Sequence, residues 1–89
     1  MTWLINFSAQ AEKFLEQQRI SKDGIYELIR KALMKFRGEQ INVDLKKLGG
    51  EWEGFHRIRK GKVRIIAEFN FDNTSVFIEV IDWRGSAYK

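Results

Sequence analysis

The sequence contains no cysteine and only one histidine among its 89 residues. Without cysteine the chain forms no disulfide and offers no thiolate as a zinc ligand or nucleophile, which fits a reducing compartment. A single histidine also excludes an acid–base pair of two histidines. The first residues show neither a basic leader nor a long apolar run, so we expect no signal peptide, no transmembrane segment and a cytoplasmic protein.

The composition is that of a globular protein. Apolar residues make up 44% of the chain and charged residues 31%, a balance that requires neither disorder nor a membrane. The length suffices for one modest core, and we expect a single domain over residues 1–89. The net charge is +4. Such a mild excess is informative only where it is concentrated on one surface.

Apolar periodicity predicts a short strand followed by two helices. Residues 2–7 alternate as a half-buried strand does. Ser8 fits the N-cap of a helix over residues 9–20. A second helix over residues 21–36 has apolar residues at spacings of three and four, and Gly38 fits its C-terminal cap. We interpret both apolar stripes as core, although a partner-binding surface has the same pattern.

The second half of the chain returns to a period of two. Residues 54–59, 62–70 and 74–82 read as three antiparallel strands that are joined by short turns, after a connector that contains "DLKKLGG". The sequence therefore predicts an α+β fold in the order β-α-α-β-β-β. In this fold two helices pack on one face of a twisted, mainly antiparallel sheet.

The predicted hairpin "GFHRIRKGKVRII" carries an unusual amount of like charge. Ile58 and Ile65 face the core in this reading, so Arg57, Arg59 and Arg64 all point to the opposite face. Like charges on neighbouring strands repel, and folding does not require them. Clustered guanidinium groups suit an anion, phosphate in particular. The alternative is an ordinary solvated face.

Other residues that could carry chemistry have simpler interpretations. His56 has the parity of Ile58, so we expect it on the core side with a structural role. Glu51 and Glu53 lie in a loop as a weak pair of metal ligands, and we predict no metal site. Trp52 and Trp83 could stack on bases or pack at the rim of the core. The C-terminal segment adds Arg84, a further candidate phosphate ligand, and Tyr88, a phenol for proton transfer or stacking.

Four short segments in this order resemble the RelE/ParE superfamily of bacterial and archaeal toxins from type II toxin–antitoxin systems. They are "INFSAQAEKFLEQ", "LKKLGG", "RIRKGKVRII" and "IDWRGSAYK", and together they span nearly the whole chain. The resemblance implies a RelE-like fold. It also implies an enzyme that enters the ribosomal A site and cuts messenger RNA without metal or cofactor. In that reaction a 2′-hydroxyl attacks the adjacent phosphate and leaves a 2′,3′-cyclic phosphate.

The resemblance also implies site residues and partners. The catalytic positions of the family fall on Arg57, Arg59, Arg64, Arg84 and Tyr88. Further RNA contacts are expected from Lys46, Lys47, Lys60 and Lys62. The expected partners are the ribosome, its messenger RNA and a cognate antitoxin that forms a hetero-oligomer with the toxin.

One departure from the family keeps alternatives open. The best-known RelE branch has a lysine pair where this chain has Arg57 and Arg59. A guanidinium is a poor proton acceptor, so these residues suit charge stabilisation and leave Tyr88 as the candidate base. A ParE-like poison of DNA gyrase and a non-enzymatic RNA- or ribosome-binding module are the alternative functions.

Overall fold

The computed structural model describes residues 2–83. In chain order, its elements are β1 (Leu4–Phe7), α1 (Ala9–Gln18), α2 (Lys22–Phe36), β2 (Asp44–Lys47), the short 3-10 helix η1 (Gly50–Trp52), β3 (Phe55–Lys60), β4 (Val63–Asn70) and β5 (Ser75–Trp83).

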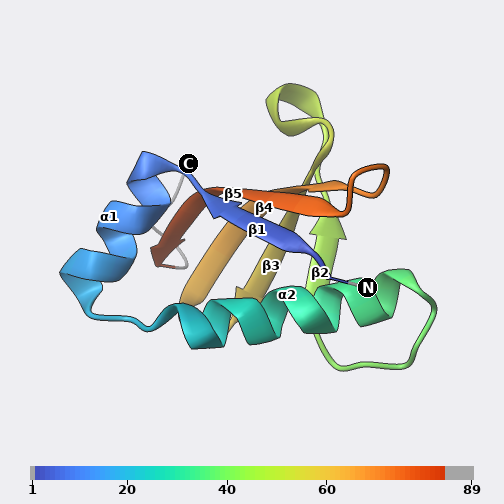
Figure 1. The fold of residues 1–89 in the computed structure, drawn as a ribbon, viewed down its shortest axis with the longest axis horizontal. Coiled ribbons are helices and arrows are strands. Elements are labelled where there is room, and N and C mark those ends of the chain that lie inside the picture. Colours follow the sequence, from blue (N-terminus) through green and yellow to red (C-terminus); the bar gives the residue numbers. More distant parts are fainter. Residues whose placement is uncertain (1, 84–89) are drawn as a thin grey trace.

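All five strands form one sheet in the order β1-β5-β4-β3-β2. β1 pairs with β5 in parallel, and the other three pairs are antiparallel. Figure 1 shows α2 running along one side of the sheet, α1 beside the end of β5, and the loop with η1 projecting away from α2. The two helices and the mainly antiparallel sheet confirm the predicted fold class. None of the helices within residues 2–83 is long and apolar enough to cross a membrane.

Both helices begin where the sequence predicts. The hydroxyl of Ser8 accepts a hydrogen bond from the Ala11 amide at 3.1 Å, and that of Ser21 accepts one from the Asp23 amide at 3.0 Å. Each bond satisfies a backbone donor that has no partner within its helix. Gly38 follows the end of α2 with φ of 90°, a conformation that glycine adopts without strain.

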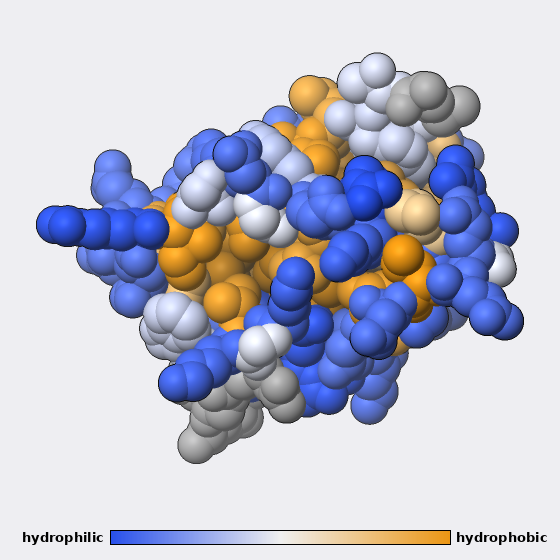
Figure 2. All heavy atoms as spheres, turned by 90° about the horizontal axis from the view of Figure 1, so that it is seen from below, coloured by the Kyte–Doolittle hydropathy of each residue, from blue (hydrophilic) through white to orange (hydrophobic). Residues whose placement is uncertain are grey.

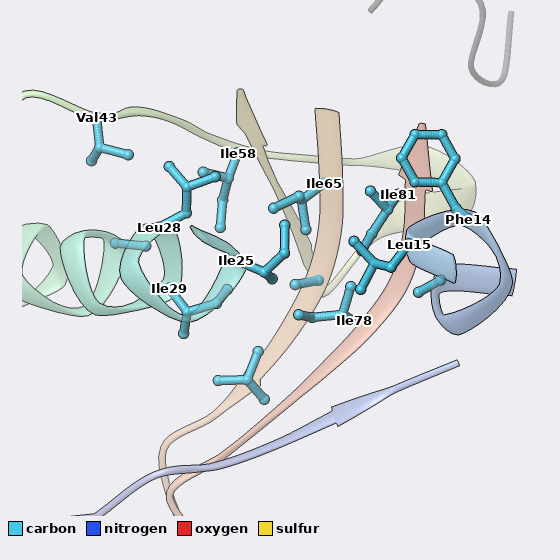
Figure 3. Close-up of a cluster of buried hydrophobic side chains, with 14 residues drawn as sticks. Phe14, Leu15, Ile25, Leu28, Ile29, Val43, Ile58, Ile65, Ile78 and Ile81 are labelled. Atoms are coloured by element: carbon cyan, nitrogen blue, oxygen red, sulfur yellow. The ribbon is translucent and has the colours of Figure 1, made fainter. Parts of the chain in front are cut away.

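The core lies between the helices and one face of the sheet (Figure 3). Aliphatic side chains of α2 pack against isoleucines of the three central strands, and Phe14 and Leu15 of α1 close the end near β5. The side chains of Ile58, Ile65, Ile78 and Ile81 are fully buried. Burying each such side chain stabilises the fold by roughly 1.5–3 kcal/mol. On the α2 side, hydrophilic side chains cover most of the surface, and hydrophobic groups are visible in the hollows between them (Figure 2).

A β-bulge in β5 reverses which side chains face the core. Ile66 pairs with Val80, but the next residue of β4, Ala67, pairs with Ile78, so Glu79 has no partner in the register. Regular alternation would send Ile78 to the face opposite to Ile81. The extra residue keeps both in the core. The Ser8 hydroxyl donates to the Glu79 carbonyl at 2.6 Å, which ties the bulge to the start of α1.

The structure adds one strand to the predicted order. Residues 44–47, which we expected as part of a connector, form β2 at the edge of the sheet. Only Leu45 of this strand has an apolar side chain, and the other three residues are exposed. Four residues with a single apolar position are too short to show a period of two. This additional strand brings Asp44 beside the arginines of β3.

Candidate functional site

The open face of the sheet, which is the face opposite to the helices, carries the predicted arginines. Arg59 of β3 lies directly opposite Arg64 of β4, and Arg57 is two residues from Arg59 on the same strand. Directly paired residues share a face, and so do residues two apart. The structure therefore places Arg57, Arg59 and Arg64 together.

Acidic residues stand at both ends of the arginine pair. The register across four strands runs Asp44, Arg59, Arg64, Asp82, and we call this set the arginine row. Two adjacent arginines repel each other, whereas an acid opposite each one offsets that repulsion. The row thus explains how the fold holds two guanidinium groups on neighbouring strands.

Asp44 binds two arginines at once. Its Oδ2 accepts a hydrogen bond from Nε of Arg59 at 2.8 Å, and its Oδ1 lies 3.4 Å from Nη2 of Arg57. The hydrogen bond from Arg59 is the main reason that the pKa of Asp44 lies below its ordinary value of 3.8. Both oxygens of the Asp44 carboxylate contact these arginines. Arg57 and Arg59 can therefore bind an anion that presents two oxygens, as a phosphate does.

The arginine side chains of the open face are partly buried. The side chain of Arg57 is 14% exposed and that of Arg59 is 30% exposed. The Nε atoms of Arg57 and Arg64 are buried. Ile66, which pairs with Arg57 on the open face, is fully buried although it lies outside the core cluster. Partial burial of these side chains removes part of their hydration, which strengthens the attraction of their charges for an anion.

The four lysines that we expected to contact RNA do not all share this face. Lys46 pairs with Arg57 and lies on the open face. Lys47 pairs with His56, and Lys60 pairs with Val63, so both occupy positions of the core-side parity. Their expected contact with RNA stays a prediction, although strand alternation places them on the face opposite to the arginines. Lys62 is exposed in the turn between β3 and β4.

His56 lies on the core side, where its ring packs edge-on against aromatic side chains. Its ring centroid is 4.9 Å from that of Phe36 and 5.7 Å from that of Phe69. Burial, with a smaller effect of Lys47, lowers the pKa of His56 from its ordinary value of 6.5. Its Nδ1 is buried with no hydrogen-bond partner in residues 2–83. This environment favours the neutral form of the ring, and the ring lies on the face opposite to the arginines.

The remaining candidates fall into two groups. Trp83 packs edge-on against Phe14 of the core at 5.3 Å, which is the rim contact that was one of its two interpretations. Trp52 packs edge-on against Phe55 at 5.4 Å, outside the core cluster. Glu51 and Glu53 are exposed at η1. The second group, Arg84 and Tyr88, lies outside the described residues.

This arrangement can stabilise negative charge, and the described residues near it include no strong base. Arg57 and Arg59 of β3 share the open face with Arg64 of β4, and guanidinium groups stabilise negative charge on an oxyanion. Arginine does not accept a proton at neutral pH, and the only histidine is on the opposite face. Sequence reasoning missed Asp44, because its contact with the arginines depends on the additional strand.

Solved structures of toxins have the same architecture. The chain is 27% identical to RelE in the archaeal RelE–RelB complex from Pyrococcus horikoshii, with 98% of this chain and 100% of the other covered and a TM-score of 0.59. For the RelBE2 toxin–antitoxin complex from Mycobacterium tuberculosis the identity is 21%, the coverage 94% and 100%, and the TM-score 0.60. For a metal-bound toxin from Helicobacter pylori these values are 11%, 98% and 100%, and 0.69.

No protein-family model matches the sequence, and the curated proteins include no significant match. The structural comparisons nevertheless cover nearly the whole chain and nearly all of each toxin. The chain has the RelE-like fold, and its resemblance to RelE-type toxins is confirmed at the level of the structure.

Proposed function

We propose that this chain is the toxin of a type II toxin–antitoxin module and a ribosome-dependent messenger RNA endoribonuclease. The observation that carries the proposal is the direct pairing of Arg59 with Arg64, with Arg57 beside them, on the open face of a RelE-like fold. Such a face binds a phosphate of an RNA backbone, and it stabilises the additional charge that develops during cleavage.

In the proposed reaction, the 2′-hydroxyl of one nucleotide attacks the adjacent phosphate. The bond from phosphorus to the 5′-oxygen of the next nucleotide breaks, which leaves a 2′,3′-cyclic phosphate, and the 5′-oxygen takes up a proton from water to become a 5′-hydroxyl. Arg57, Arg59 and Arg64 hold the phosphorane. Tyr88 is our candidate for the base that takes the proton of the 2′-hydroxyl, and Arg84 is the candidate for a further phosphate ligand.

Dependence on the ribosome follows from the weakness of the site as a proton acceptor. When the catalytic groups supply little acid–base assistance, correct alignment of the reacting atoms must supply much of the rate. Alignment alone contributes roughly 7–11 kcal/mol in favourable cases. A ribosome that holds the message in a fixed conformation provides such alignment, whereas free RNA does not.

The proposed partner is an antitoxin. Two of the compared structures are toxin–antitoxin complexes. Within this chain, Asp44 already binds Arg57 and Arg59 through a carboxylate, so acidic side chains of an inhibitor can bind in the same manner. Apolar contacts would supply most of the affinity, while the charges set orientation and association rate.

The experiment that tests the function compares two targets in cells. We expect that expression of the chain stops growth and that primer extension on cellular messages shows new 5′ ends within translated regions. A gyrase cleavage assay on the same cells should show no excess of broken DNA. Gyrase-dependent DNA breaks with intact messages would establish the ParE-like alternative, and growth arrest with neither would establish a binding module.

A further inference from the structure

The bulge in β5 has a second consequence, on the open face. Because Glu79 has no partner, the side chains beyond it change faces, and Phe77 comes to lie opposite Glu68. Without the extra residue, Ile78 would oppose Glu68 and Phe77 would point toward the helices. Bulges of this kind re-aim side chains near functional sites. Phe77 is 37% exposed, whereas its neighbours Val76 and Ile78 are buried.

The residues in register with Glu68 form a second row on the open face. Phe55 of β3 and Phe77 of β5 both pair with Glu68 of β4. We call these three residues the aromatic row. The row therefore has an aromatic ring on each side of a carboxylate. Glu68 is exposed and forms no ion pair within the described part of the chain.

The distance between the strands that carry Phe55 and Phe77 leaves room for a flat ligand between the two ends of the aromatic row. Neighbouring strands lie about 4.8 Å apart, so the backbones that carry Phe55 and Phe77 are about 9.6 Å apart. A planar ring between two others requires roughly 7–8 Å, twice the best separation of carbon atoms. Trp52 packs edge-on against Phe55 at 5.4 Å and holds that ring at one end of the aromatic row.

We infer that Phe55, Glu68 and Phe77 form a subsite for an RNA base, with guanine preferred and uracil rejected. The inference rests on the proposed function, because it takes the ligand of the open face to be RNA. Aromatic side chains stack on any base, which supplies affinity without selectivity. A carboxylate accepts hydrogen bonds from two adjacent donors, and the Watson–Crick edge of guanine presents two, whereas that of uracil presents one donor between two acceptors.

The position of the subsite relative to the arginine row determines which nucleotide it reads. Glu68 is four residues from Arg64 on β4, which corresponds to about 13 Å along the strand. Ile66 and Val80 form an apolar pair between the two rows. A phosphate at the arginine row and a base at the aromatic row therefore belong to different nucleotides. The subsite reads a neighbour of the cleaved bond and sets a sequence preference.

The charge of the open face favours RNA over an acidic protein segment as the ligand of the aromatic row. Lys46 and Arg57 lie between the aromatic row and the arginine row in the register, and they offer cations to a chain that bears a phosphate at each step. An acidic segment would pair with the same cations but would place like charge beside Glu68. An amino-bearing base pairs with Glu68 instead.

The test measures binding of the purified chain to fluorescently labelled RNA hexamers that differ in one central base. We expect guanine to bind about tenfold more tightly than uracil, and Glu68→Gln to bring that ratio close to one. Phe77→Leu should weaken binding of every hexamer about tenfold. Two exposed positions away from the aromatic row provide the matched controls. Glu16→Gln, on the exposed side of α1, is the control for Glu68→Gln, and Phe71→Leu, in the turn after β4, is the control for Phe77→Leu.

The outcomes separate this inference from the proposed function. An unchanged ratio in Glu68→Gln, or no hexamer binding by the wild-type chain, would overturn the subsite even if messages are cut on ribosomes. A guanine preference that Glu68→Gln abolishes would support the subsite even if the chain cuts no RNA. Loss of antitoxin binding in Phe77→Leu, with RNA binding unchanged, would show that the aromatic row binds protein instead.

Discussion

The two faces of the sheet are built from the same strands, but they differ in what their side chains contact. On the helix side, Ile58 and Ile65 pair across β3 and β4 and are fully buried against apolar side chains. On the open face, their sequence neighbours Arg59 and Arg64 pair across the same two strands with an acid beyond each one. Adjacent residues of one strand therefore contribute either to the buried core or to the charged open face.

The strongest contrast between the faces concerns activity. We expect Arg64→Ala to slow cleavage on ribosomes about 100-fold, because one of the groups that stabilise the phosphorane is lost. Single-turnover cleavage of a defined message measures the effect. Arg30→Ala, on the exposed side of α2, is the matched control and should cut at the wild-type rate. Equal rates for Arg64→Ala and the control would remove the open face from the chemistry.

A substitution in the core tests the face of the sheet that packs against the helices. Ile65→Ala should lower the free energy of unfolding by about 3 kcal/mol, because it removes buried methyl groups and leaves a cavity. Lys46→Ala, on the exposed part of the open face, should change it by no more than about 0.5 kcal/mol. Urea unfolding followed by tryptophan fluorescence measures both values. A loss below about 1 kcal/mol for Ile65→Ala would contradict the assignment of this face as the core.

Asp44 reduces the positive charge of the open face, and its removal tests how far that charge determines RNA binding. Asp44→Asn should raise the affinity for an RNA hexamer about threefold, since a carboxylate no longer competes with phosphate for Arg57 and Arg59. Asp23→Asn, near the start of α2, controls for the change in net charge. A weaker affinity in Asp44→Asn would instead identify Asp44 as a positioning residue that orders the arginines for the ligand.

The smallest expected effect concerns His56. Because its pKa is lowered in the folded chain, the unfolded chain takes up the proton first as the pH falls below 6.5. The wild-type chain should therefore lose stability as the pH falls below about 6.5. His56→Phe should lack this part of the decline and be about 1 kcal/mol more stable at neutral pH, because a buried nitrogen without a partner is gone. Cleavage at an unchanged rate would agree with a structural role.

Much of the fold could be predicted from local signals. Ser8 and Ser21 cap the helices as their side-chain chemistry suggests, and the alternation in residues 62–70 identifies the face of each side chain on β4. The side that carries Arg57, Arg59 and Arg64 followed from that alternation alone. These features depend on neighbours in the sequence, which is why the sequence reveals them.

Features that depend on distant pairing could not be predicted in this way. β2 is recognised only by its hydrogen-bonded partner β3, so Asp44 read as a residue of a connector. The bulge at Glu79 becomes visible only in the register of β4 with β5, so Phe77 gave no signal as a neighbour of Glu68. Arg84 and Tyr88 stay predictions, because they lie outside the described residues.

The proposed function is tested by measuring how the purified wild-type chain cleaves two substrates, the same message free in solution and held on translating ribosomes. We predict cleavage on ribosomes, little cleavage of the free message, and no change on addition of a chelator. Rapid digestion of the free message would contradict the claim that alignment compensates for a site without a strong base. Intact message on both substrates would contradict the assignment of the arginine row as a ribonuclease site.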